Sequence, residues 1–299
     1  MDMMRFDTMW TAGLVALGLL ISTVPSTAQP VVDGQTDDAD YIQLGTATGD
    51  AGYGEDVGIK SMSSFATADS LYIAIEGKID VTGGDFREYV VFINAETPTG
   101  IPSGTALPPG SDGLSPFSQL DGMILDAEVD YGIRFTGGGS DNGFVSIVDY
   151  VSFSSGDTDA SDSFEATLSA DGSVSTGGTS QGSYAYLDAA DLSSVSASGF
   201  ELAIPLSFIG ASAGDTFQLF AFHGQVENDQ VGAHLIPDDG VDTQYSNSVD
   251  WTAVSGIQFT SPSILPVELA AFDALADGRS AVLTWSTVSE INNGRIVVE

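Results

Sequence analysis

Residues 71–77 have the sequence LYIAIEG, and residues 89–93 have the sequence YVVFI. In the first stretch, Leu71, Ile73 and Ile75 alternate with their neighbours, which is the period-2 pattern of a strand with one face in a core and the other partly wet. The second stretch is apolar at every position, which predicts a central strand covered on both faces. Together they predict a β-sheet protein with a packed core.

Short apolar runs of the same kind recur along the chain between clusters of Gly, Asp, Ser and Pro, and no long segment keeps a helical period. The expected strands are Gly58 to Phe65, Leu71 to Gly77, Tyr89 to Asn94, Tyr131 to Phe135, Val145 to Phe153, Phe164 to Leu168, Phe200 to Pro205 and Phe217 to Phe222. This spacing predicts an all-β fold, a two-sheet antiparallel sandwich of the jelly-roll kind. Two stretches are long for loops, and we interpret Thr97 to Pro116 and Ser169 to Ser183 as binding loops or disordered insertions.

The composition is strongly acidic, with 42 Asp and Glu against 7 Lys and Arg and a formal net charge of −35. Nucleic acids and anionic lipids are bound through Lys and Arg, so this balance excludes both as partners. Since 42% of the residues are hydrophobic, we expect a packed core with the acidic excess on the surface. Such a surface suits a halophilic protein, because charge repulsion is screened within about 3 Å in 1 M salt. It also offers cation-binding sites.

The N-terminus carries an apolar run from Met9 to Val24, followed by Ser26 and Ala28 in the small-x-small pattern of a cleavage site. The run is too short to span a membrane, so we interpret residues 1–28 as a signal peptide. The chain has no cysteine, which leaves an exported protein without disulfides or thiolate metal sites. We therefore expect an extracellular or cell-surface location.

The rest of the chain divides into two unequal parts. Residues 29–260 are long enough for one large sandwich, and two prolines mark residues 261–266 as a linker. Residues 267–299 contain two alternating apolar runs, around Leu269 to Leu275 and Ala281 to Trp285, which are too few to close a second sandwich. We interpret this last part as an incomplete β domain.

Several segments occur in an order that is known from one group of sandwiches. They are Val31-Val32-Asp33-Gly34, Leu71 to Gly77 and Leu202-Ala203-Ile204-Pro205-Leu206, and in this order residues 31–260 resemble family 9 carbohydrate-binding modules and DOMON-like sandwiches. The tail, with Leu265 to Leu269 and Leu283 to Asn293, resembles the fibronectin-III-like segment that precedes the sorting domain of type IX secretion cargo. The resemblance implies a secreted or surface-attached protein that binds a polysaccharide or a cell-surface glycan.

Carbohydrate-binding sandwiches present exposed aromatic rings, because a flat ring packs against the apolar face of a sugar. Family 9 modules are known for a pair of tryptophans, whereas Trp251 is the only tryptophan between residues 31 and 262. We therefore take Trp251, Tyr184, Tyr186 and Tyr245 as candidate ligand-binding residues. The alternative for each is ordinary packing.

Calcium is the cofactor that the acidic turns suggest, because it takes several carboxylate and carbonyl oxygens from one turn. Asp157, Asp159 and Asp162 resemble the start of a calcium loop, although Asp162 stands where an EF-hand has glycine. Asp33 and Asp37 form a second cluster. The alternative for both clusters is solvated surface.

No catalytic template is complete in the sequence, and we expect a protein that is not an enzyme. The leading hypothesis is an exported, non-catalytic module that binds carbohydrate at the cell surface. The alternatives are a structural or adhesive surface protein with calcium-stabilised loops, and an accessory domain of a larger secreted enzyme.

Overall fold

The structure is a computed structural model that describes residues 29–53, 56–80, 87–110, 120–225, 230–238, 245–246, 249–253, 269–277 and 280–287. The predicted signal peptide and the predicted linker, residues 261–266, lie outside these described residues.

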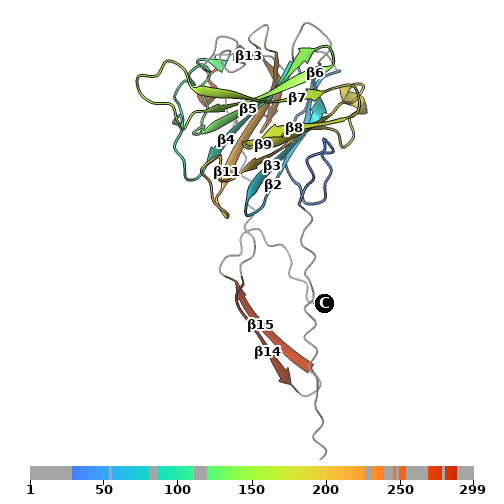
Figure 1. The fold of residues 1–299 in the computed structure, drawn as a ribbon, viewed down its shortest axis with the longest axis vertical. Coiled ribbons are helices and arrows are strands. Elements are labelled where there is room, and N and C mark those ends of the chain that lie inside the picture. The colour runs from blue at the N-terminus through green and yellow to red at the C-terminus, as the bar shows by residue number, and fades with distance from the viewer. Residues whose placement is uncertain are drawn as a thin grey trace, which may run out of the picture.

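Two antiparallel sheets pack against each other as a sandwich (Figure 1). The first sheet has six strands, in the order β1 (Ile42–Thr46), β2 (Gly58–Ala66), β3 (Ser70–Lys78), β10 (Gly199–Pro205), β9 (Gly182–Leu187) and β8 (Val174–Thr179). The second has seven, in the order β13 (Tyr245–Ser246), β12 (Gln230–Ile236), β11 (Phe217–Gln225), β4 (Arg87–Ala95), β5 (Tyr131–Gly139), β6 (Asn142–Asp149) and β7 (Ser161–Ser169). The predicted all-β, two-sheet antiparallel sandwich is confirmed.

The main core lies between the two sheets and is built from alternate residues of their strands. On β3, the inward side chains of Leu71, Ile73 and Ile75 are fully buried. From the second sheet, Val91 and Ile93 of β4 belong to the same cluster. The period-2 pattern of the sequence therefore identifies the inward face correctly.

A second core covers the outer face of the seven-stranded sheet. Val90 and Phe92, on the opposite face of β4, pack there with Ile101 from the connection between β4 and β5. Trp251, in a short 3-10 helix (Trp251–Ala253), belongs to the same cluster. Every residue of 89–93 is buried, as predicted for a strand covered on both faces.

One of the two stretches that we interpreted as loops contains a strand. Residues 174–179 form β8, which pairs with β9 at the edge of the six-stranded sheet. The interpretation of Ser169 to Ser183 as an insertion is therefore wrong. The strand shows no apolar alternation because most of its side chains are exposed, so packing does not select their type.

The last described residues form a small sheet of their own. Strands β14 (Leu269–Asp277) and β15 (Ser280–Thr287) pair antiparallel with each other, in the region of the two predicted alternating runs. Among the described residues, no helix is long and apolar enough to cross a membrane.

Candidate functional site

The aromatic residues predicted to bind a ligand are mostly buried. Tyr184, Tyr186 and Trp251 each have 0% of their surface exposed. Tyr184 stacks on Phe200 in the main core with ring centroids 6.4 Å apart, and Trp251 packs edge-on against Phe220 at 4.9 Å. A ring without exposed area cannot lie against a sugar. This burial corrects the prediction, because these three rings do not form an exposed platform.

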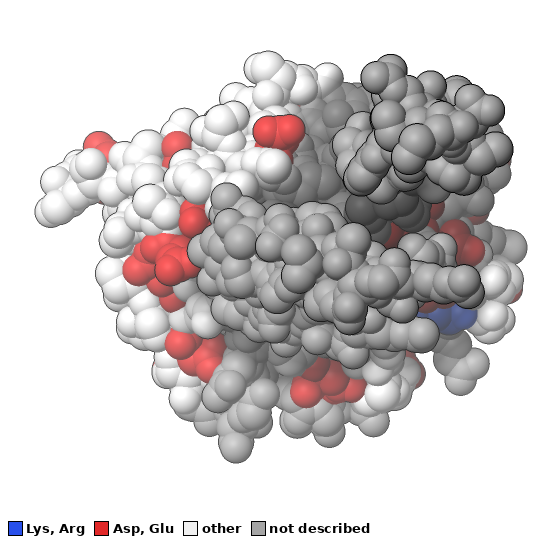
Figure 2. Space-filling view, turned by 90° about the horizontal axis from the view of Figure 1, so that it is seen from below, with Lys and Arg blue, Asp and Glu red and all other residues white. Residues whose placement is uncertain are grey.

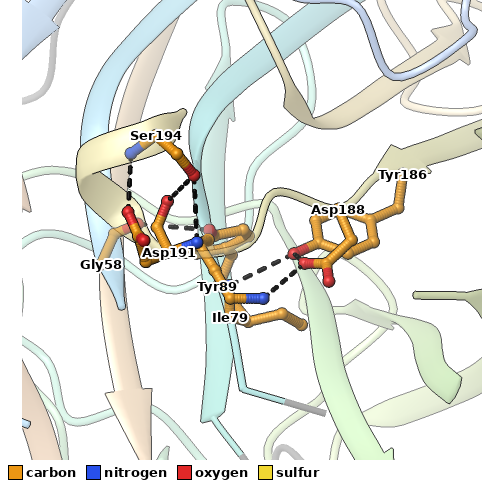
Figure 3. Close-up of polar contacts among 8 residues, drawn as sticks. Gly58, Ile79, Tyr89, Tyr186, Asp188, Asp191 and Ser194 are labelled. Atoms are coloured by element: carbon orange, nitrogen blue, oxygen red, sulfur yellow. Dashed lines mark hydrogen bonds and ion pairs between the residues drawn. The ribbon is translucent and has the colours of Figure 1, made fainter. Parts of the chain in front are cut away.

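The hydroxyl of Tyr186 is also engaged within the fold (Figure 3). It accepts a hydrogen bond from the backbone N–H of Ile79 at 3.3 Å and donates one to the carboxylate of Asp188 at 2.7 Å. Asp188 in turn pairs with Lys78 at 2.8 Å. This network joins the end of β9 to the end of β3. The fourth candidate, Tyr245, lies in β13, and its side chain is outside the described part of the structure.

The aspartates predicted to bind calcium lie in two separate parts of the chain. Asp157 and Asp159, between β6 and β7, are exposed and make local hydrogen bonds. Asp157 accepts one from the backbone N–H of Ser154 at 2.9 Å, and Asp159 accepts one from the hydroxyl of Thr158 at 2.8 Å. Asp162 follows in β7. These are the contacts of acidic turns.

The second aspartate cluster lies near the start of the described chain. Asp33 accepts hydrogen bonds from the backbone N–H of Gln35 at 2.9 Å and from its side-chain amide at 3.1 Å, and Asp37 is exposed. Within the described residues, no group of three or more His, Cys, Asp or Glu side chains is placed to hold a metal ion. Calcium binding therefore stays a prediction of the sequence.

Residues 30–41, which we call the N-terminal strap, pack on the outer face of the six-stranded sheet. The backbone of the strap approaches β9 so closely that a Cβ on Gly34 would lie 2.6 Å from the backbone nitrogen of Leu187, and the φ of Gly34 is +83°. Only glycine fits this position. Tyr72 on β3, predicted to be partly wet, is 3% exposed, and its hydroxyl accepts a hydrogen bond from the side-chain amide of Gln29, directly before the strap.

A groove of about 580 Å³ opens beside the strap. Its floor includes Tyr72 of β3, Ala203 of β10 and Ser183 of β9, which are cross-strand partners and therefore share one face of the sheet. The full lining consists of Gln29, Pro30, Val31, Val32, Tyr72, Thr176, Gly177, Ser183, Tyr184 and Ala203. The volume falls within the range of roughly 300–1,000 Å³ that is usual for small-molecule sites.

The lining of the groove is uncharged and has two kinds of surface. Pro30, Val31 and Val32 supply an apolar wall, and the Val31 side chain is 61% exposed. Thr176 and Ser183, both exposed, supply hydroxyls. None of the lining residues is Asp, Glu, Lys, Arg or His. The groove is thus suited to a ligand with an apolar face and a hydrogen-bonding edge.

The neutrality of the groove contrasts with the rest of the surface. Figure 2 shows Asp and Glu side chains at several separate places on one face of the molecule, with a single small area of Lys or Arg. The whole chain carries a formal charge of −35. An anionic ligand would be repelled by this field, whereas a neutral ligand would not.

A second exposed feature lies on the opposite sheet. Phe144 of β6 and Phe164 of β7 are 42% and 60% exposed, and their rings meet edge-on with centroids 6.3 Å apart. Thr136 and Thr167 flank Phe144 on the neighbouring strands. The Phe144 ring lies over Gly138, where an added Cβ would come 2.1 Å from the ring. These are the two exposed aromatic residues among those whose burial is described.

Comparison with family models, with curated proteins and with solved structures found no match to this chain. Its function therefore has to be argued from its own residues.

Sequence reasoning missed most of the residues that line the groove. Tyr184 is the one candidate ligand residue that also lines it, and its ring belongs to the core. Thr176 and Ser183 lie in a stretch without apolar alternation, and residues 29–32 reach them only in the folded chain. The pattern of the sequence held no signal for this arrangement.

Proposed function

We propose that the sandwich is an exported, non-catalytic binding module whose ligand is a neutral carbohydrate held in the groove on the six-stranded sheet. The proposal depends on the uncharged lining of this groove in a chain with 42 acidic residues. Export is inferred from the sequence of residues 1–28 and from the tail that resembles type IX secretion cargo.

The chemistry of the lining favours a sugar over other neutral ligands. A pyranose ring has an apolar face formed by its C–H groups and an edge of hydroxyls, and binding sites for it combine apolar contact with a few placed hydrogen-bonding groups. Val31 and Val32 can cover the apolar face. The hydroxyls of Thr176 and Ser183 can exchange hydrogen bonds with the edge, since each both donates and accepts.

A second candidate function is adhesion through the exposed pair Phe144 and Phe164. Two aromatic rings on an open sheet face, flanked by threonines, suit contact with the flat surface of an insoluble polysaccharide or with a partner protein. Because this pair and the groove lie on different sheets, variants can separate the two functions.

The test is a titration of soluble, neutral hexasaccharides of glucose, xylose and mannose by calorimetry, in about 1 M NaCl, where the Debye length is about 3 Å. We expect one of them to bind. Thr176→Val removes a groove hydroxyl at nearly constant shape, and it should weaken binding about 3- to 10-fold, or about 0.7–1.4 kcal/mol for one hydrogen bond.

Thr46→Val is the matched control, because Thr46 is also exposed and also lies on an edge strand, β1, at the opposite edge of the same sheet. Its affinity should equal that of the unchanged protein. If none of the three hexasaccharides binds, or if both threonine substitutions weaken binding equally, the groove is not the carbohydrate site. Binding to insoluble polysaccharide that is lost only in Phe144→Ala and Phe164→Ala would support the second candidate instead.

A further inference from the structure

One buried carboxyl group anchors the N-terminal strap. Glu201, on the outer face of β10, has 0% of its surface exposed. Its Oε2 accepts hydrogen bonds from the backbone N–H groups of Asp33 at 3.0 Å and Gly34 at 2.7 Å. Its Oε1 accepts one from the hydroxyl of Tyr41 at 2.8 Å. All three donors belong to the strap, so this side chain fixes both its middle and its end.

No positive charge compensates this carboxyl within the described residues. Its hydrogen-bond donors are the two N–H groups and the Tyr41 hydroxyl, and its direct cross-strand partners on β3 and β9 are alanines. The titratable groups on the elements packed around it are, on the strap, Asp33, Asp37, Asp38, Asp40 and Tyr41, on β3, Tyr72, Glu76 and Lys78, and on β9, Tyr184 and Tyr186. The one cation among them, Lys78, pairs with Asp188 at 2.8 Å. A carboxylate buried without a cation is costly, and the acidic neighbours raise that cost.

We propose that Glu201 is the positioning residue that holds the strap as a wall of the groove, so that docking of the strap, and with it binding in the groove, is linked to protonation of this carboxyl. The inference rests on the proposed function, since it concerns the regulation of the same groove. The strap residues Pro30, Val31 and Val32 form the apolar wall, and they directly precede the anchored Asp33 and Gly34.

The direction of the linkage follows from burial. Burial raises the pKa of Glu201 from 4.5 to about 7, although the three hydrogen bonds act in the opposite direction. When the strap is released, the carboxyl meets water and its pKa returns toward its ordinary value. The docked state therefore binds the proton more tightly than the released state, and docking weakens as the pH rises from the ordinary value through about 7.

Protonation need not break the contacts of the strap. A protonated carboxyl can donate its O–H to the hydroxyl oxygen of Tyr41, while its other oxygen still accepts from Asp33 and Gly34. Acid therefore removes the buried charge and leaves the geometry of the anchor in place. The groove should be best formed below neutral pH.

The test measures amide hydrogen exchange of residues 31–36 at pH values from below 4.5 to above 7, the two limits of the linkage, with exchange rates corrected for their intrinsic pH dependence and β11 as the internal reference. For the unchanged protein, protection of the strap should fall by up to about tenfold per pH unit between 4.5 and about 7, and it should not change further above about 7, where the carboxyl is ionised in both states. Glu201→Gln keeps an acceptor without a titrating charge, and it should make this protection independent of pH. Tyr41→Phe, the matched control, should lower protection at every pH but keep the pH dependence.

A strap whose protection does not change with pH would overturn the inference, and so would a Glu201→Gln variant with the pH dependence of the unchanged protein. The hexasaccharide titrations above, repeated at several pH values between 4.5 and about 7, should show affinity falling with strap protection. If protection follows pH but none of the hexasaccharides binds at any pH, the proposed function fails while the anchoring role of Glu201 stands. If a hexasaccharide binds with pH-independent affinity, the regulatory role fails and the function stands.

Discussion

At the scale of single residues, His223 is the most unusual buried polar group. Its side chain is 0% exposed, and neither ring nitrogen has a hydrogen-bond partner in the described part of the structure. The rings of Tyr53 and Tyr89 lie 5.2 Å and 6.0 Å from it, centroid to centroid. Burial lowers the pKa of His223 well below 6.5, and the nearby His234 and Arg87 lower it further. The imidazole is therefore neutral at pH 7.

Replacing His223 by phenylalanine should stabilise the protein. Two unpartnered polar atoms are removed from the core, where each costs about 1–3 kcal/mol, and the ring shape is nearly kept. Because the unfolded chain takes up a proton below about pH 6.5 and the folded imidazole does not, the unchanged protein should lose about 1.4 kcal/mol per pH unit below that point at this site. Chemical unfolding at several pH values should show that the stability advantage of His223→Phe over the unchanged protein grows as the pH falls.

His234 provides the contrasting control. Its Nδ1 accepts from the backbone N–H of Ile59 at 3.1 Å, and its Nε2 must donate to the carbonyl of Gly49 at 3.1 Å, since a carbonyl only accepts. His234→Phe should therefore destabilise the protein by about 1–3 kcal/mol, because it leaves the buried backbone N–H of Ile59 unpaired. If both substitutions change the free energy of unfolding in the same direction, the absence of hydrogen-bond partners at His223 does not explain the effect of His223→Phe.

At the scale of elements, the start of β10 depends on a close approach between backbones. Gly199 donates its N–H to the carbonyl of Gly34 at 3.1 Å, and a Cβ at Gly199 would lie 2.0 Å from the carbonyl oxygen of Ile75. Backbone atoms of β3 cannot move away as a flexible side chain can. Gly199→Ala should cost about 3 kcal/mol. The urea concentration at the midpoint of unfolding should fall, while the dependence of the unfolding free energy on urea concentration should not change.

Gly104→Ala is the control for the conformational part of this effect. Gly104 has a φ of +74° and no atom within 4 Å of an added Cβ, so its replacement meets only the penalty of the left-handed region, about 1–2 kcal/mol. A Gly199→Ala variant no less stable than Gly104→Ala would show that β3 and β10 can separate at little cost.

The strands at the centre of the sheets are predictable from sequence, whereas the edges and the groove are not. The run 89–93 predicts β4 because every residue is buried, so hydrophobicity alone identifies it. Strand β8 escapes the same reasoning because it is an exposed edge strand. The residues 183–186 alternate small residues with tyrosines, but a period of 2 does not say which face meets the core. The groove depends on contacts between distant segments, and no local pattern encodes those.

At the scale of the whole molecule, charge repulsion should govern stability. A formal charge of −35 destabilises the compact state at low ionic strength. The Debye length falls from about 30 Å at 0.01 M to about 3 Å at 1 M, so the melting temperature should rise with NaCl over this range. A second series of melting temperatures in sucrose is the control, because sucrose is excluded from the protein surface but does not screen charge. A melting temperature unchanged by NaCl would mean that the acidic side chains are too far apart to repel one another.

The same measurement can decide the calcium prediction, because screening does not distinguish two divalent cations of equal concentration. A site that takes several oxygen ligands in flexible geometry binds calcium in preference to magnesium. Any excess of the melting temperature in CaCl2 over that in MgCl2 therefore reports specific binding to the folded state. If Asp157→Asn with Asp159→Asn abolishes the excess, the turn between β6 and β7 is the site predicted from the sequence. Equal melting temperatures in the two salts would mean that these aspartates only solvate the surface.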